Sequence, residues 1–212
     1  MNSEYDFWLF DLDGTIVDVQ SSYIHEVCTE CAERLGVSVS AEQADYLWYG
    51  FDGTREQVFE ETGLSAEEFW DTFHNVDKPA PRAEATHIYP DAARFLAHLD
   101  GPVGLVTHCQ AYLTYPILET LGIGHWFDTV ICCTDETGWK PDPTPLELAM
   151  DDLGVGENGA VGAMVGDDPD DVGAAWNAGL DAISVERHDP DRVGGTANGD
   201  HHVTALTELL AR

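Results

Sequence analysis

The chain has 212 residues, of which 43% are hydrophobic, a proportion ordinary for a globular protein and too high for a disordered one. Forty acidic residues face nine basic ones, so the formal net charge is −31. This excess excludes nucleic acid as a partner, because affinity for phosphate backbones comes from Lys and Arg. No apolar run reaches the roughly 20 residues that cross a bilayer. The N-terminal residues lack the basic start of a secretory signal, so we expect a cytoplasmic protein without a membrane partner.

The acidic residues are spread along the whole chain and do not form one tail. This pattern resembles that of proteins adapted to concentrated salt, in which charge repulsion is screened. A metal-buffering acidic protein is the alternative, but such chains rarely contain so many aromatic and aliphatic residues. We therefore expect a halophilic protein that folds weakly in dilute buffer and recovers its structure in concentrated KCl. Full stability without salt would contradict this expectation.

Five cysteines occur in the chain. Cys28 and Cys31 form a CxxC pair within a helix-like stretch, and Cys132 and Cys133 end an apolar, strand-like run. No second CxxC and no Cys-His pair at zinc-ligand spacing accompanies them. We therefore interpret the cysteines as small buried hydrophobic residues rather than as metal ligands or redox groups.

Short apolar runs alternate with helix-like segments along the chain. The first run, Tyr5–Phe10, ends in the turn-like cluster Asp11–Thr15, and a largely helical region then extends from about residue 21 to residue 85. Its helical patterns cover residues 21–35, 40–49, 54–62 and 65–74, and the segment Lys78–Pro81 breaks the region. Beyond it we predict strands at 103–106, 129–133, 161–165 and 182–185, and helices at 90–99, 111–121, 143–153, 169–178 and 203–211. A loop rich in Gly, Asp and His is predicted from residue 187 to residue 202.

Strands joined by helices imply a parallel sheet, because a parallel pair needs a long crossover connection. Such sheets bind ligands at the carboxyl ends of their strands. The polar residues expected at those ends come from four separate segments of the chain: Asp11 and Asp13, Thr107 and His108, Lys140, and Asp167 and Asp168. We therefore predict one site in which these residues meet.

These residue types suit the hydrolysis of a phosphate monoester. The ester is a dianion, so an attacking carboxylate needs that charge to be neutralised. Asp11 and Asp167 can supply the one or two carboxylates that Mg²⁺ takes beside a substrate phosphate. Asp13 lies two residues after Asp11 and points the same way in an extended turn, so it can protonate the leaving alcohol and later activate water. The Thr107 hydroxyl and the Lys140 ammonium can bind the phosphoryl oxygens.

Four motifs in order resemble those of the haloacid dehalogenase-like (HAD) hydrolase superfamily. Asp11–Thr15 matches its DxDGT motif, and Leu105–Thr107 is similar to its second motif, an apolar strand ending in Thr or Ser. Lys140–Pro143 resembles the third motif and Gly166–Asp171 the fourth, so the resemblance covers nearly the whole chain. It implies an α/β fold of the HAD-like Rossmannoid type, a three-layer parallel sheet with an inserted helical cap. The core would comprise residues 1–16 and 88–212, and the cap residues 17–87.

The resemblance also implies a role for each residue of the motifs. Asp11 would be the nucleophile and a Mg²⁺ ligand. Asp13 would be the general acid and base, with its backbone carbonyl on the metal, and Asp167 would be the further metal carboxylate. Thr107 and Lys140 would hold the phosphate, and Lys140 would also neutralise Asp11.

Other residues near these motifs are less specific. Asp171 would orient Lys140 or a metal-bound water, with Asp168 as its neighbour, although acids here also favour the start of the following helix. His108 stands where relatives often carry Asn; it can donate to the phosphate, but its charge would depend on pH. Arg55 is interpreted as a surface residue, with contact to an anionic substrate as the alternative. The cap at 17–87 resembles that of the phosphoglycolate phosphatase and phosphoglucomutase branch, where it excludes water and contributes specificity.

The most concrete interpretation is a Mg²⁺-dependent phosphatase that hydrolyses a small phosphorylated metabolite through an aspartyl phosphate. A phosphomutase would use the same four motifs. A 2-haloacid dehalogenase would need no magnesium, but its first motif lacks an acid at the position of Asp13. A non-catalytic binding module would be expected to lack a catalytic residue, and none is missing. Phosphoglycolate, a sugar phosphate, a nucleotide and pyrophosphate all fit as the substrate.

Overall fold

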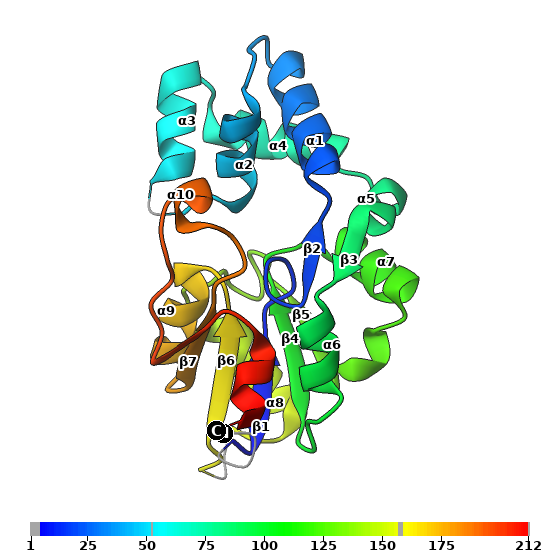
Figure 1. Ribbon diagram of the computed structural model, residues 1–212, viewed down its shortest axis with the longest axis vertical. Coiled ribbons are helices and arrows are strands. Elements are labelled where there is room, and N and C mark those ends of the chain that lie inside the picture. Colours follow the sequence, from blue (N-terminus) through cyan, green and yellow to red (C-terminus); the bar gives the residue numbers. More distant parts are fainter. Residues whose placement is uncertain (1–4, 52, 157–158, 212) are drawn as a thin grey trace.

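The computed structural model describes residues 5–51, 53–156 and 159–211. A sheet of six strands, all parallel, forms its centre in the order β5-β4-β1-β6-β7-β8 (Figure 1). The predicted α/β class with a parallel sheet is therefore confirmed. The strands are β1 (Phe7–Phe10), β4 (Val103–Thr107), β5 (Thr129–Cys132), β6 (Gly162–Gly166), β7 (Asp181–Val185) and β8 (His201–Val203).

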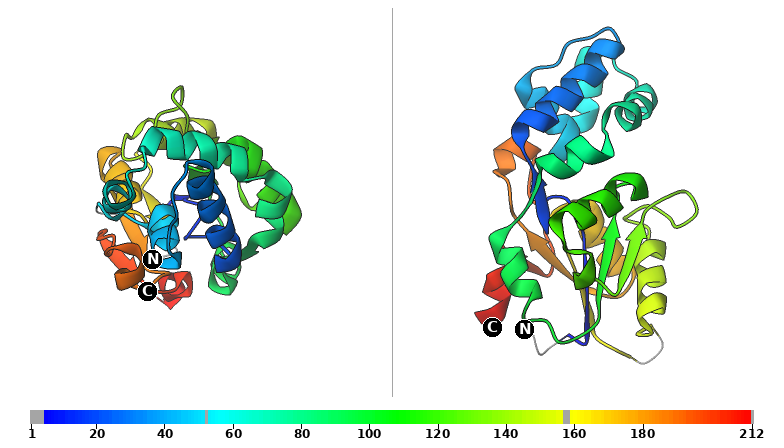
Figure 2. Two further views of the ribbon diagram at one scale, coloured as in Figure 1. Left: turned by 90° about the horizontal axis from the view of Figure 1, so that it is seen from above. Right: turned by 90° about the vertical axis from the view of Figure 1, so that its right-hand side faces the viewer.

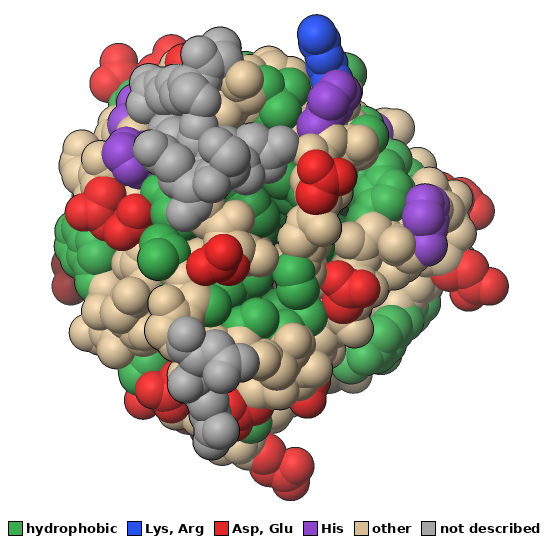
Figure 3. Space-filling model, turned by 90° about the horizontal axis from the view of Figure 1, so that it is seen from below, with side chains coloured by type: hydrophobic (Ala, Val, Ile, Leu, Met, Phe, Trp, Pro, Cys, Tyr) green, Lys and Arg blue, Asp and Glu red, His purple; other side chains and the backbone are tan. Residues whose placement is uncertain are grey.

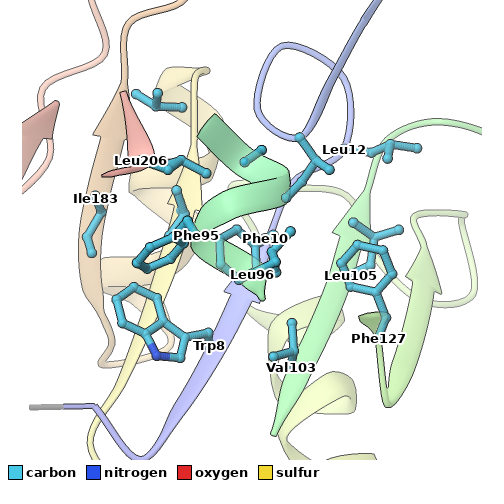
Figure 4. Close-up of a cluster of buried hydrophobic side chains, with 14 of the residues drawn as sticks. Trp8, Phe10, Leu12, Phe95, Leu96, Val103, Leu105, Phe127, Ile183 and Leu206 are labelled. Carbon is cyan, nitrogen blue, oxygen red and sulfur yellow. The ribbon is translucent and has the colours of Figure 1, made fainter. Parts of the chain in front are cut away.

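Helices cover both faces of this sheet, which gives three layers (Figure 2). Successive residues of a strand point to opposite faces: Trp8 and Phe10 pack against Phe95 on one face (Figure 4), and Phe7 and Leu9 lie in the cluster on the other. Because both faces are covered, β1 is apolar throughout and fully buried. The flanking elements are α6 (Pro90–Leu96), α7 (Ala111–Leu121), η1 (Gly124–Trp126), α8 (Thr144–Leu153), α9 (Pro169–Asn177) and η2 (Leu206–Ala211).

A helical insertion follows the first strand and lies beyond the carboxyl ends of the sheet strands (Figure 1). Two short antiparallel strands, β2 (Val17–Val19) and β3 (Thr86–Ile88), connect it to the rest of the chain. The insertion has a hydrophobic cluster of its own, which includes Ile24, Leu47 and Phe69. Its helices are α1 (Ser21–Arg34), α2 (Ala41–Tyr49), α3 (Thr54–Thr62), α4 (Ala66–Val76) and α5 (Pro79–Ala85).

The segment Lys78–Pro81 separates two helices and also begins the second of them. Helix α4 ends at Val76 and α5 begins at Pro79. Proline suits the first position of a helix, because its missing N–H has no partner there and its fixed φ is already helical. The sequence pattern predicted the break but not the helix after it.

The last part of the chain differs from the prediction. The predicted loop at 187–202 contains a short helix, α10 (Pro190–Val193), and most of strand β8, which pairs with β7. The predicted helix at 203–211 begins too early: β8 ends at Val203, and the helical part is the 3₁₀-helix η2, which begins at Leu206. The Glu208 carboxylate accepts hydrogen bonds from the backbone N–H groups of Thr204 and Ala205, at 2.9 and 3.0 Å. This local bonding holds a turn between the two elements.

The five cysteines are free thiols, and Cys28, Cys31 and Cys133 are fully buried as predicted. Cys109 and Cys132 are partly buried. Burial raises the pKa of the Cys31 thiol to about 12, which keeps it in the unreactive protonated form.

On the face shown in Figure 3, the acidic side chains are scattered rather than gathered in one patch. In the part of the chain that the structure describes, no helix is long and apolar enough to cross a membrane.

Candidate active site

The residues predicted at the strand ends meet around one cavity of about 560 Å³. Asp11 follows β1, Thr107 ends β4 and Asp167 follows β6, so three adjacent strands supply three of them. The helical insertion forms the opposite wall of the cavity. The predicted residues that line it are Asp11, Asp13, Thr107, His108, Lys140, Asp167, Asp168 and Asp171.

Lys140 is a buried cation that lines this cavity, and its side chain is 2% exposed. Its Nζ donates hydrogen bonds to Asp11 Oδ1 at 2.8 Å, Asp171 Oδ1 at 2.5 Å and the Val106 carbonyl at 3.1 Å. These three acceptors use all three N–H donors of the ammonium group. Burial alone would lower the Lys140 pKa, but the carboxylates of Asp11 and Asp171 raise it above its ordinary value. Lys140 therefore stays charged and fixes Asp11 in place.

Three carboxylates crowd beside Lys140. One oxygen of each lies within 4.8 Å of the others: Asp11, Asp167 and Asp171. Burial raises the pKa of Asp11 to about 7, with Lys140 acting against it, and burial with the charges of Asp11 and Asp171 raises the pKa of Asp167 well above its ordinary value. When all three are ionised, they exceed the single ammonium group by two negative charges, and their oxygens are hard donors. This donor set fits one divalent cation such as Mg²⁺.

A tight turn brings the first motif against Asp167. Gly14 has a φ of +77°, in the region that favours glycine, and its N–H donates to the Val17 carbonyl at 2.8 Å. A Cβ on Gly14 would lie 2.2 Å from Asp167 Oδ2. The next residue, Thr15, donates from its hydroxyl to Asp167 Oδ1 at 3.1 Å. The turn thus leaves room for the Asp167 carboxylate and orients it.

Replacing Gly14 by Ala should displace Asp167 and lower the catalytic activity by about 100-fold or more, because misplaced catalytic geometry costs that much. Gly36→Ala is the matched control: Gly36 has a φ of +82° with nothing within 4 Å of its Cβ position. Gly36→Ala should lose about 1–2 kcal/mol of stability through backbone strain. Gly14→Ala should lose at least as much, and only Gly14→Ala should lose activity. Steady-state kinetics with urea unfolding measures both. Equal activity in the two variants would contradict this account of the turn.

The start of α9 explains the run of acids in the fourth motif. The Asp168 side chain accepts from the Asp170 N–H at 2.9 Å, and Asp171 Oδ2 accepts from the Asp168 N–H at 3.2 Å. These two bonds form a capping box at the helix N-terminus. Asp171 therefore has two functions, capping α9 with one oxygen and holding Lys140 with the other. Asp168 lines the cavity, and its bonds are those of a helix cap.

The second motif presents a hydroxyl and a neutral ring. Thr107 Oγ1 accepts from the Cys109 N–H at 3.0 Å, and no acceptor among the described residues takes its hydroxyl hydrogen, which can therefore be donated to a ligand. Burial, together with the charges of Lys140 and Arg55, lowers the pKa of His108 to about 3. The pH-dependent charge considered for His108 therefore does not arise near neutrality. Its buried Nε2 has no hydrogen-bond partner among the described residues.

Sequence reasoning missed Arg82, which extends from α5 to the first motif. Its Nη2 donates to Asp13 Oδ1 at 2.6 Å, and its guanidinium lies 4.4 Å from the centre of the Trp48 ring of α2. The only signal in the sequence was composition, because Arg82 is one of only nine basic residues. Arg55, interpreted above as a surface residue, also lines the cavity, as do the helical-insertion aromatics Trp48, Trp70 and Phe73.

The sequence model of one protein family, described as haloacid dehalogenase-like hydrolase, matches residues 8–185. The chain belongs to this family. A curated phosphoglycolate phosphatase from Nitrosococcus oceani is 31% identical over 192 residues, covering 84% of this chain and 82% of that protein. The pyrophosphatase PpaX of Bacillus velezensis is 30% identical over 182 residues, covering 84% and 81%. These relatives place the chain in the phosphoglycolate phosphatase-like branch of the HAD hydrolases.

Solved structures support the same fold. A HAD-like hydrolase from Streptococcus pneumoniae superposes with a TM-score of 0.77 at 20% identity, covering 99% of this chain and 98% of that one. A HAD-superfamily hydrolase of subfamily IA from Geobacter sulfurreducens gives 0.72 at 17% identity, covering 98% of each chain. The expected HAD-like fold and the expectation of a HAD-family enzyme are both confirmed.

Proposed function

We propose that this HAD hydrolase is a Mg²⁺-dependent phosphatase that forms an aspartyl phosphate on Asp11. The observation that carries the proposal is the buried bond from Lys140 to Asp11, beside a carboxylate cluster and with Asp13 lining the same cavity. Lys140 offsets the charge that would otherwise repel a phosphate dianion. The relatives named phosphoglycolate phosphatase and pyrophosphatase support the same chemistry.

In the first step, a carboxylate oxygen of Asp11 attacks the phosphorus of the substrate. A bond forms between that oxygen and phosphorus, and the bond from phosphorus to the ester oxygen breaks. Asp13 gives its proton to the ester oxygen, so the leaving group departs as a neutral alcohol. Thr107 donates its hydroxyl hydrogen to the phosphoryl oxygens.

In the second step, Asp13 is a carboxylate and acts as the base. It takes a proton from a water molecule, whose oxygen attacks the phosphorus. The bond between phosphorus and Asp11 breaks, and inorganic phosphate leaves. Dividing the reaction in two in this way replaces one difficult displacement by two easier ones.

The metal would be held by the carboxylates of Asp11 and Asp167, with the backbone carbonyl of Asp13 as the further protein ligand. When bound, Mg²⁺ would neutralise negative charge on the phosphoryl oxygens. The crowding of Asp11, Asp167 and Asp171 supports this assignment. Asp171, which already bonds Lys140 and caps α9, orients Lys140 rather than acting as a direct metal ligand.

The helices α1–α5 would act as a cap over the site, with the core formed by residues 1–16 and 88–212. The core and the helical insertion both line the cavity between them, and the residues that the insertion contributes include several aromatic side chains. Such a wall excludes water from the phosphoenzyme and selects the leaving group. A small phosphorylated metabolite fits this enclosure.

The direct test is phosphate release from p-nitrophenyl phosphate in about 2–3 M KCl, a salt range in which the Debye length falls below roughly 3 Å. We expect release that requires Mg²⁺ and stops with a chelator. Parallel assays for halide release and for sugar-phosphate isomerisation separate a dehalogenase and a mutase from a phosphatase. A folded enzyme that releases no phosphate with Mg²⁺ would contradict the proposal.

The stability of the metal-free enzyme should fall as pH rises. The Asp11 pKa is raised from 3.8 to about 7, so between these values the folded chain binds a proton that the unfolded chain does not. The contribution of the Asp11 carboxyl group to the free energy of unfolding is fully present below about pH 4 and is lost as pH rises through 7.

Mg²⁺ binds the ionised carboxylates, so its stabilising effect should grow from pH 5 to pH 8. Urea unfolding at fixed KCl, with Mg²⁺ or chelator, measures this. A magnesium effect that is the same at both pH values would contradict the metal assignment.

A further inference from the structure

Arg82 is the residue of the helical cap that reaches the catalytic motif. Its side chain is 4% exposed, and its Nη2 donates to Asp13 Oδ1 at 2.6 Å. The guanidinium lies against the Trp48 ring, and the Arg82 carbonyl accepts from the Thr86 hydroxyl at 2.7 Å. Two elements of the cap, α2 and α5, therefore fix the direction in which this guanidinium points.

Asp13 depends on this contact for its orientation. In the part of the chain that the structure describes, no other side chain bonds to the Asp13 carboxyl group. The Asp13 side chain is 27% exposed and lines the cavity, so without Arg82 its carboxyl group would be free to rotate. A charge-assisted hydrogen bond from a planar guanidinium restrains it in one rotamer.

We propose that Arg82 is a positioning residue for the general acid and base, which holds the Asp13 carboxyl group toward the oxygen of the leaving group. The proposal rests on the function proposed above for Asp13. It places one part of the catalytic apparatus on the cap: the acid is aligned only when α5 lies over the core. Proton transfer is sensitive to this alignment, because the donor must lie within hydrogen-bond reach of the leaving oxygen.

A purely structural function for Arg82 is the competing explanation. Its Nη1 lies 3.9 Å from Asp77 Oδ2, and Asp77 is 1% exposed and accepts from the Tyr23 hydroxyl at 2.6 Å. Arg82 could therefore serve only to neutralise a buried acid of the cap. In that case its loss would lower stability and would affect all substrates to the same extent, whatever their leaving group.

The leaving group separates the two explanations. An alkoxide is strongly basic and needs a proton as it departs, whereas p-nitrophenolate is a weak base and departs with little help. Because kcat/KM reports the transfer to Asp11, it is sensitive to the acid function of Asp13. Loss of a positioning residue for that acid should therefore lower kcat/KM far more for an alkyl phosphate than for p-nitrophenyl phosphate.

The experiment measures kcat/KM with methyl phosphate and with p-nitrophenyl phosphate, in saturating Mg²⁺ and concentrated KCl. Arg82→Gln should lose about 100-fold with methyl phosphate and about 5-fold with p-nitrophenyl phosphate, within the range that general acid catalysis contributes. Arg82→Lys keeps the charge but not the planar fork, so its loss with methyl phosphate should be smaller, about 10-fold. This partial rescue also keeps the test informative if the glutamine variant fails to fold.

A double-mutant cycle tests the partner directly. With methyl phosphate, Asp13→Ala should cost about 10³-fold, and adding Arg82→Gln or Arg82→Lys should cost less than about 3-fold more, because a positioning residue has no function without its partner. Losses that multiply, or equal losses with the two substrates, would overturn the proposal. Activity that survives Asp11→Asn would instead refute the proposed mechanism, so the two failures can be told apart.

Discussion

Replacing Asp11 by Asn should lower kcat/KM for phosphate release by at least about 10⁴-fold, the scale of effect seen when a covalent nucleophile is removed. The amide is nearly the same size as the carboxylate but cannot form the aspartyl phosphate. Substrate binding should survive, since Thr107 and Lys140 remain in place. The measurement is phosphate release with p-nitrophenyl phosphate in Mg²⁺ and concentrated KCl.

Asp170→Asn is the matched control for this variant. It removes one negative charge from the same cavity, and no function in the mechanism is assigned to its carboxylate. We expect its kcat/KM to stay within about 3-fold of the wild-type value, the scale of a modest electrostatic change. Similar losses in both variants would show that the cavity needs its negative charge rather than a nucleophile at Asp11.

Replacing Lys140 by Met should lower kcat/KM by about 10³-fold, in the range found when a preorganised donor is removed from a reaction site. The change also leaves Asp11 and Asp171 as buried carboxylates without their cation. Breaking a buried pair in this way costs about 3–5 kcal/mol of stability. Urea unfolding and steady-state kinetics, both in concentrated KCl, measure the two effects.

The chain offers a close control for this variant, because Lys78 is its only other lysine and is exposed. Lys78→Met should leave the free energy of unfolding and kcat/KM within the small range typical of surface substitutions. If Lys140→Met retained wild-type stability, the bonds from Nζ to the two carboxylates would not hold in solution.

The segments that form the buried parallel strands and the position of the site follow from features that are local in the sequence. An apolar run that ends in polar residues indicates both a buried parallel strand and its carboxyl end. This is why Asp11, Thr107 and Asp167 were predicted on one edge and are found there. Lys140 was found through its motif, but its three acceptors come from three other segments and needed the structure.

Features that depend on distant partners were not predictable. Arg82 and Asp13 are 69 positions apart, and the prolines before Arg82 indicated a break rather than a helix that reaches the site. Strand β8 is only three residues long and gains its stability from pairing with β7. The neutral state of His108 comes from burial and from the cations Lys140 and Arg55 around it, which no spacing rule reveals.

The central claim is that the phosphoryl group passes through Asp11. The most direct test mixes the enzyme with p-nitrophenyl phosphate and Mg²⁺ in concentrated KCl and stops the reaction with acid within milliseconds. Peptide mass spectrometry then locates any phosphoryl group. We expect the added mass of one phosphoryl group on the peptide that contains Asp11, and none in Asp11→Asn. Rapid phosphate release without a phosphorylated peptide, or a phosphoryl group on any other residue, would contradict the account.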